Sequence, residues 1–69
     1  MSVDDLSFKR GSSDFYFALY DDRCIAFIYD KSNTVIINSE ASERLQEFVR
    51  SHREEIRQAF RKYLVKEML

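Results

Sequence analysis

The sequence has no proline, no tryptophan and a single glycine, Gly11. Because proline and glycine are the strongest interruptions of regular structure, long helices and strands can run through most of this chain. The single cysteine, Cys24, excludes an intrachain disulfide and a zinc site built from several cysteines. No apolar run reaches the roughly 20 residues of a membrane-spanning helix. The first five residues lack the basic and then apolar order of a signal peptide, so we expect a reduced, cytoplasmic setting.

The charges nearly balance, with 11 basic and 12 acidic side chains and a net charge of −1. A weakly acidic protein is a poor non-specific binder of nucleic acid. Residues 50–66, however, hold six basic side chains against Glu54 and Glu55. Four of them recur at three- and four-residue steps, which places them on one stripe of a helix: Arg50, Arg53, Arg57 and Arg61. This stripe is either a solvated helix face or a surface for phosphates or an acidic protein.

The first half of the chain predicts an antiparallel sheet. Aromatic and β-branched residues form short runs separated by turn residues. Gly11 is expected to supply a positive φ in the first turn, and Asp21-Asp22 to tolerate the left-handed conformation of a tight hairpin. Since short connections join antiparallel neighbours, we predict a meander. Its strands are expected at residues 6–9, 15–20, 23–29 and 34–38.

Neither face of the predicted sheet is polar. Strict alternation groups Phe15, Phe17 and Leu19 on one face of their strand, opposite Tyr16, Ala18 and Tyr20. In the next strand it groups Ile25, Phe27 and Tyr29, opposite Cys24, Ala26 and Ile28. An antiparallel sheet usually has one wet face. We therefore expect a helix to cover one face and a partner subunit or a ligand to cover the other.

The second half predicts one long helix over residues 39–68, with Ser39 as its N-cap. At 1.5 Å per residue it would be about 45 Å long, while no predicted strand exceeds about 25 Å. We therefore expect its second half to pack on another copy of the chain, which would also stabilise so small a core. The expected dimer interface consists of Ile56, Phe60, Tyr63 and Leu64. The chain is thus predicted as one α+β domain of order ββββα, with residues 1–5 as a flexible tail, 6–38 as the sheet and 39–68 as the helix.

The layout resembles the purine-rich-element-binding (PUR) repeat of the Whirly-like single-strand-binding group. The resemblance rests on Phe8-Lys9-Arg10-Gly11 leading into Phe15-Tyr16-Phe17, on the strand Arg23 to Ile28, and on Thr34 to Ile37 running into a helix that opens with Ser39-Glu40-Ala41. It covers nearly the whole chain from Leu6 onward. It implies four antiparallel strands, one long helix, an intertwined homodimer and binding of single-stranded nucleic acid. The sequence departs from the family at Asp21-Asp22, where the family has a glycine.

No catalytic constellation is visible, so we expect neither an enzyme nor a cofactor or metal site. Cys24 and His52 are interpreted as packed side chains, and Asp21, Asp22 and Asp30 as turn residues. The leading hypothesis is a homodimer that binds single-stranded DNA or RNA by aromatic stacking and basic contacts to the backbone. The alternative is a protein-interaction module, a small dimeric regulator or inhibitor with no nucleic-acid role, whose helix or sheet binds another protein. The expected nucleic-acid-binding residues are Lys9, Arg10, Tyr16, Tyr20, Arg23, Phe27, Tyr29 and Lys31.

Overall fold

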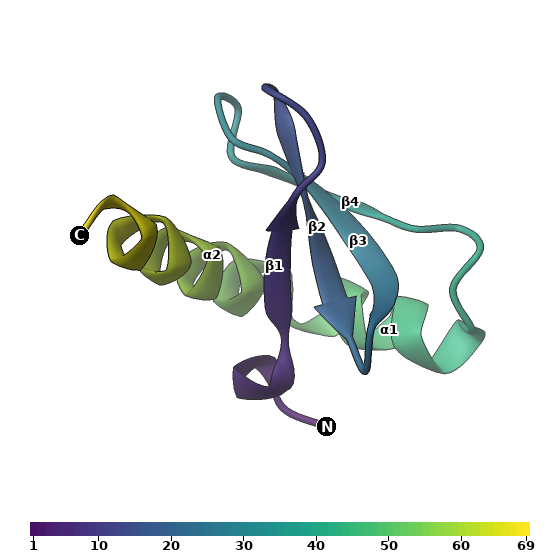
Figure 1. The fold of residues 1–69 in the computed structure, drawn as a ribbon. Coiled ribbons are helices and arrows are strands. Elements are labelled where there is room, and N and C mark those ends of the chain that lie inside the picture. The colour runs from purple at the N-terminus through teal and green to yellow at the C-terminus, as the bar shows by residue number, and fades with distance from the viewer.

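The computed structural model describes all 69 residues and consists of one sheet followed by two helices (Figure 1). The four strands are antiparallel and lie in the order β1-β2-β3-β4. The α+β class and the antiparallel meander predicted from the sequence are therefore confirmed. The elements are β1 (Ser7–Arg10), β2 (Phe15–Tyr20), β3 (Arg23–Tyr29), β4 (Thr34–Ile37), α1 (Glu43–Ser51) and α2 (Arg53–Met68).

The prediction of a single helix over residues 39–68 is wrong, first because the helix begins later. Ser42, rather than Ser39, is the N-cap of α1, and its Oγ accepts a hydrogen bond from the N–H of Leu45 at 3.3 Å. Ahead of this cap, the Asn38 side-chain oxygen accepts from the N–H of Glu40 at 3.0 Å. Such side-chain bonds give the backbone an alternative to helix. The segment between β4 and α1 is consequently a loop.

The helix is also interrupted at His52, whose φ of −123° and ψ of 25° are not helical. The His52 Nδ1 lies 2.9 Å from the carbonyl oxygen of Phe48, and the two rings stack with centroids 4.4 Å apart. The interruption leaves two helices of about 14 and 24 Å, and both reach the sheet. The expected dimer was based on a helix too long for its own sheet, and the structure contains no such helix.

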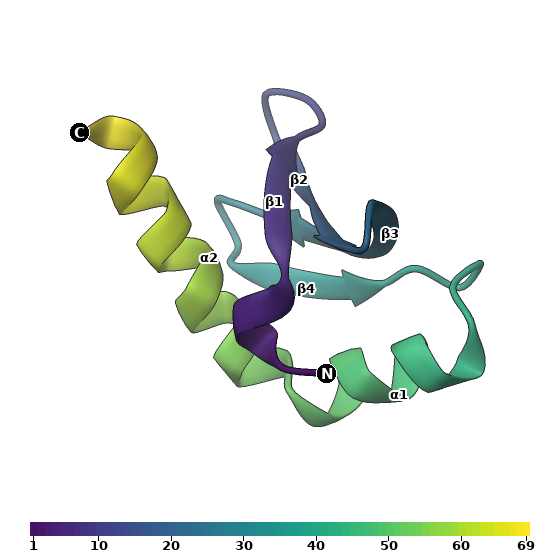
Figure 2. The same cartoon turned by 60° about the horizontal axis from the view of Figure 1, so that its bottom comes forward.

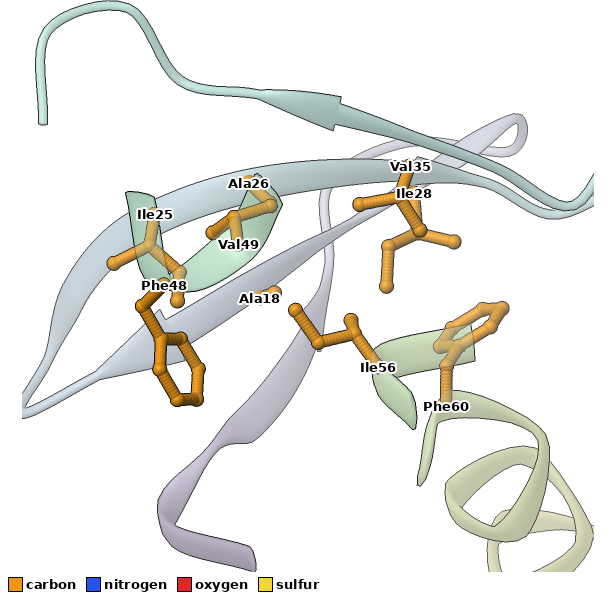
Figure 3. Packing of buried hydrophobic residues seen from close by; sticks show 9 residues of the cluster. All are labelled: Ala18, Ile25, Ala26, Ile28, Val35, Phe48, Val49, Ile56 and Phe60. Atoms are coloured by element: carbon orange, nitrogen blue, oxygen red, sulfur yellow. The ribbon is translucent and has the colours of Figure 1, made fainter. Parts of the chain in front are cut away.

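Both helices cover the same face of the sheet, as Figure 2 shows, with α1 running beneath β4. The core between these layers contains nine buried residues (Figure 3). Ile25, Phe48 and Val49 gather where α1 meets the sheet, and Phe60 lies near Ile28 at the other end. No helix is both long and apolar enough to cross a membrane.

A β-bulge in β3 changes which side chains share a face. Ala18 pairs with Ala26 while Leu19 pairs with Cys24, so Ile25 has no partner in β2. Ile25 and Ala26 are both fully buried, which means that consecutive side chains point to the helices. The alternation that placed Ile25 with Phe27 and Tyr29 is therefore wrong at this residue, because one extra residue resets the pattern.

Of the two predictions of positive φ in the turns, the one for Asp21-Asp22 is confirmed and the one for Gly11 is wrong. Asp21 and Asp22 have φ values of 52° and 63°, the left-handed conformation expected for the hairpin. Gly11, by contrast, does not have a positive φ. The glycine instead leaves room for two rings, because a Cβ at this position would lie 2.5 Å from Cε2 of Phe15 and 3.0 Å from Cε2 of Phe17.

The N-terminal residues expected as a flexible tail contain a 3-10 turn, η1 (Val3–Asp5). Ser2 and Asp5 form a reciprocal capping box around it: the Ser2 Oγ accepts from the N–H of Asp4, and the Asp5 carboxylate accepts from the N–H of Ser2. Val3 packs against the core, and η1 contacts α2. These contacts place β1 beside the second helix.

Candidate functional site: the open face of the sheet

One face of the sheet carries seven apolar side chains that do not pack against the core. Their positions follow from the register, since directly paired residues point to the same side of a sheet. Phe17 pairs with Phe27, which pairs with Ile36, while Phe15 pairs with Tyr29 and Leu19 with Cys24. We call this surface the open face. It consists of Phe15, Phe17 and Leu19 from β2, Cys24, Phe27 and Tyr29 from β3, and Ile36 from β4.

The four aromatic rings of the open face form one cluster. The Phe15 ring lies 5.4 Å from Phe17, 6.2 Å from Phe27 and 5.7 Å from Tyr29 between centroids, and Phe17 lies 5.8 Å from Phe27. Three of these four contacts are edge-to-face, a favourable arrangement for aromatic pairs. Tyr29 remains 40% exposed and Ile36 45% exposed. Contiguous apolar patches on protein surfaces often mark interaction sites, which makes the open face the candidate site of this chain.

The open face carries little charge. Lys9 pairs with Phe17 and is the only charged side chain that the strand register places on this face. Ser7 and Thr34, which pair with Leu19 and Tyr29, add two hydroxyl groups at its borders. Lys31 is exposed in the turn between β3 and β4. The surface is therefore apolar at its centre and weakly polar at its edges.

The predicted nucleic-acid-binding residues are divided between the two faces of the sheet. Lys9, Phe27 and Tyr29 lie on the open face. The Tyr16 ring packs on the helix side, with its centroid 5.0 Å from that of Phe60, and the Arg10 guanidinium lies 6.0 Å from the Tyr16 centroid.

Two other expected residues lie elsewhere on the helix side. Tyr20 packs against the core and pairs with Arg23. Tyr20 and Arg23 line a hollow of about 240 Å³ with Arg44. The fold therefore does not bring the eight residues together.

Sequence reasoning missed five members of the open face: Phe15, Phe17, Leu19, Cys24 and Ile36. The alternation in β2 already grouped the first three on one face, and this was the available signal. The pairing between strands could not be predicted, and it is this pairing that places Phe27 and Tyr29 on the same face as that group, away from Tyr16.

The four residues expected at a helix-mediated dimer interface lie against the chain's own core. Ile56 and Phe60 are fully buried. Tyr63 and Leu64 are half-buried and pack against the same core. Ile56 and Phe60 have no accessible surface in the folded chain, so a partner could not contact these two side chains directly.

Much of the arginine stripe has partners within the chain. Arg50 forms an ion pair with Glu47. The Arg57 Nε donates to the carbonyl oxygen of Asn33 at 2.9 Å, and a second Arg57 nitrogen pairs with Glu54 at 2.9 Å. Arg61 lies 3.5 Å from the carboxylate of Asp30. Arg57 and Arg61 thereby fasten α2 to the turn between β3 and β4, where Asn33 has a φ of 54°.

We predict that Arg57→Ala lowers the free energy of unfolding by about 1–2 kcal/mol, as expected for losing a partly buried hydrogen bond from a charged donor. Arg61→Ala should cost less than about 0.5 kcal/mol, because that ion pair is exposed. Urea denaturation followed by circular dichroism measures both values. Equal effects of the two substitutions would contradict the clamping role of Arg57.

The pKa values of two side chains are raised, those of Cys24 in β3 and Tyr63 in α2. Burial raises the pKa of the Cys24 thiol, although hydrogen bonds to Ala26 and from Asn38 work in the opposite direction. Burial likewise raises the pKa of Tyr63, and the neighbouring Glu67 carboxylate raises it further. The raised pKa disfavours the thiolate, which is the nucleophilic form of cysteine. No group of three or more histidine, cysteine or acidic residues is arranged to hold a metal ion.

Comparison of the chain with known protein families, curated proteins and solved structures found no match. The similarity to the PUR repeat accordingly rests on the residues quoted above and stays a prediction.

Proposed function

We propose that this protein is a small, non-enzymatic binding module that uses the open face to bind an apolar protein surface. The observation that carries the proposal is the aromatic cluster of Phe15, Phe17, Phe27 and Tyr29, which lies on the sheet face that neither helix covers. Aromatic residues are enriched at the centres of protein interfaces, whereas charged residues are depleted there. The open face has this composition.

The weak charge of the open face favours a protein ligand over a nucleic acid. Binding of single strands combines stacking with a basic groove that follows the phosphates. Lys9 is the only cation that the strand register places on this face, while Arg10 and Arg23 belong to the opposite side. Three of the four rings are also half-buried by one another, so their faces are only partly available for bases.

The second candidate is binding of single-stranded nucleic acid through a reduced set of the expected residues. It is favoured by the exposed ring of Tyr29 beside Phe27, with Lys9 on the same face and Lys31 in the adjacent turn. Stacking on such rings contributes about 1–3 kcal/mol per base. A labelled single strand titrated at two salt concentrations tests it, with Tyr29→Ala on the open face and Tyr16→Ala on the helix side as the matched pair. Tight binding that only Tyr29→Ala weakens would favour this candidate over a protein ligand.

We predict that a photoreactive amino acid at Ile36 forms crosslinks to protein in cells. Ile36 is 45% exposed on the open face, so the replacement leaves the core intact. The matched control carries the same group at Val65, which is 59% exposed on α2. Crosslinks from position 36 should exceed those from position 65. They should disappear when Tyr29→Glu places a charge in the same surface.

Two outcomes would count against the proposal. The first is equal crosslinking from positions 36 and 65, which would show that the open face is not preferred. The second is crosslinking from position 36 to nucleic acid alone. Circular dichroism of the Tyr29→Glu variant checks that the loss of crosslinks does not arise from unfolding.

A further inference from the structure

We infer that the apolar partner of the open face is a second copy of this chain, packed face to face across a two-fold axis. The inference rests on the proposed function and names its ligand. In the resulting dimer the two sheets form the inner layers and the helices the outer ones. Such a layering buries both faces of each sheet, the usual arrangement for apolar sheet faces.

The charge distribution fits self-association. In a two-fold interface each patch meets an identical patch, so any strong net charge on it would repel itself. The open face carries a single cation, Lys9, and this residue lies on β1 at the edge of the sheet. A lysine at the rim keeps its ammonium group in water while its aliphatic stem covers apolar surface. The apolar centres of two copies can thus pack together without bringing like charges face to face.

The size of the face fits a weak association between two copies. A specific interface removes about 800 Å² from each partner, roughly a sixth of the 4820 Å² surface of this chain. The strands contain four, six, seven and four residues. At about 3.3 Å per residue and about 4.8 Å between strands they cover roughly 330 Å² in projection, and the projecting side chains increase the accessible area. The face therefore supplies less than the standard area, in the size class of weak and transient interfaces. We expect a dissociation constant on the order of micromolar or weaker, because interfaces of this size are typical of weak complexes.

The small core supplies a thermodynamic reason for the association. Nine buried residues are few for a chain of 69, and domains of this size bury a small share of their surface. Packing two open faces together adds a second apolar layer built mainly from Phe15, Phe17, Phe27 and Tyr29. The thermal midpoint of unfolding should consequently rise with protein concentration.

Sedimentation under reducing conditions, from about 5 to about 500 µM, tests the inference, because a weak dimer forms by mass action. The mass should rise from 8.3 kDa toward twice that value. Ile36→Glu should keep the protein monomeric, since it places a charge on an exposed position of the open face. Val65→Glu, on an exposed position of α2, should dimerise like the parent. A parent that stays monomeric at the highest concentration, or an Ile36→Glu variant that dimerises equally well, would overturn the inference.

Alkylation of Cys24 supplies a second readout, because this thiol lies on the open face. Its rate should fall as the concentration of the parent rises and stay constant in Ile36→Glu. A constant rate in the parent would contradict a dimer through this face. If the purified protein is monomeric while position 36 still crosslinks to another protein, the dimer fails and the proposed function stands. If no protein crosslink forms either, both fail.

Discussion

Phe60→Ala is expected to lower the free energy of unfolding by about 3–5 kcal/mol, the range for removing a buried phenylalanine. Phe60 is fully buried, and its ring contacts Phe8 at 5.6 Å and Tyr16 at 5.0 Å between centroids. Phe60 and Tyr63, whose ring also lies 5.4 Å from Phe8 and 6.1 Å from Tyr16, thus join α2 to both β1 and β2. A domain of this size has roughly 4–10 kcal/mol of stability in total. The substitution should therefore remove a large share of the total stability and lower the urea midpoint strongly.

Urea denaturation at one fixed protein concentration measures this effect, because any association would add to the apparent stability. Met68→Ala is the matched control on the same helix, since Met68 is 84% exposed. It should change the free energy of unfolding by less than about 0.5 kcal/mol. A Phe60→Ala variant with the midpoint of the parent would mean that α2 does not pack on the sheet in this way.

Asn38→Ala is expected to cost about 1–3 kcal/mol, the penalty for leaving a partly buried polar group without its partner. The Asn38 Nδ2 donates to the carbonyl oxygen of Cys24 at 2.9 Å, and its Oδ1 accepts from the N–H of Glu40 at 3.0 Å. Cys24 lies beside the bulge, where the hydrogen-bond ladder between β2 and β3 is irregular. One side chain therefore supports both the bulge and the loop into α1.

Asn38→Asp separates the two contributions. Aspartate keeps an oxygen that can accept from the N–H of Glu40 but has no N–H to offer the Cys24 carbonyl. If the bond to Cys24 dominates, Asn38→Asp should be about as unstable as Asn38→Ala. Ser39→Ala, at the exposed neighbouring position, is the control and should behave like the parent. A fully stable Asn38→Ala variant would contradict the role of this residue at the bulge.

Strand positions could be predicted closely from the sequence, because aromatic and β-branched runs were bounded by turn residues. The bounds of β2 and β3 agree with the prediction at both ends, and β1 and β4 differ by one residue. The helix was harder to predict. Phe48, Val49, Ile56 and Phe60 keep the spacing of one continuous helical stripe, so periodicity alone gave no sign of the interruption at His52. The interruption follows from packing, which brings both halves onto a sheet shorter than the stripe.

The candidate site was only partly predictable, because long-range packing decides which face of the sheet stays open. Both faces of the sheet are apolar, so hydropathy did not indicate which one the helices cover. That choice depends on long-range contacts such as the packing of Tyr16 against Phe60. Tyr16 and Tyr29 were therefore interpreted as one stacking surface, although they lie on opposite faces.

The bulge at Ile25 amounts to a one-residue insertion that the hairpin has absorbed. Without Ile25, Cys24 would directly precede Ala26, and plain alternation would still place Cys24 and Phe27 on one face and Arg23 and Ala26 on the other. The pairing with β2 could then continue with no irregularity. What the extra residue adds is a second consecutive side chain beneath α1, together with the stronger local twist that bulges produce. The chain thereby gains core volume at this point while the open face keeps its order of side chains.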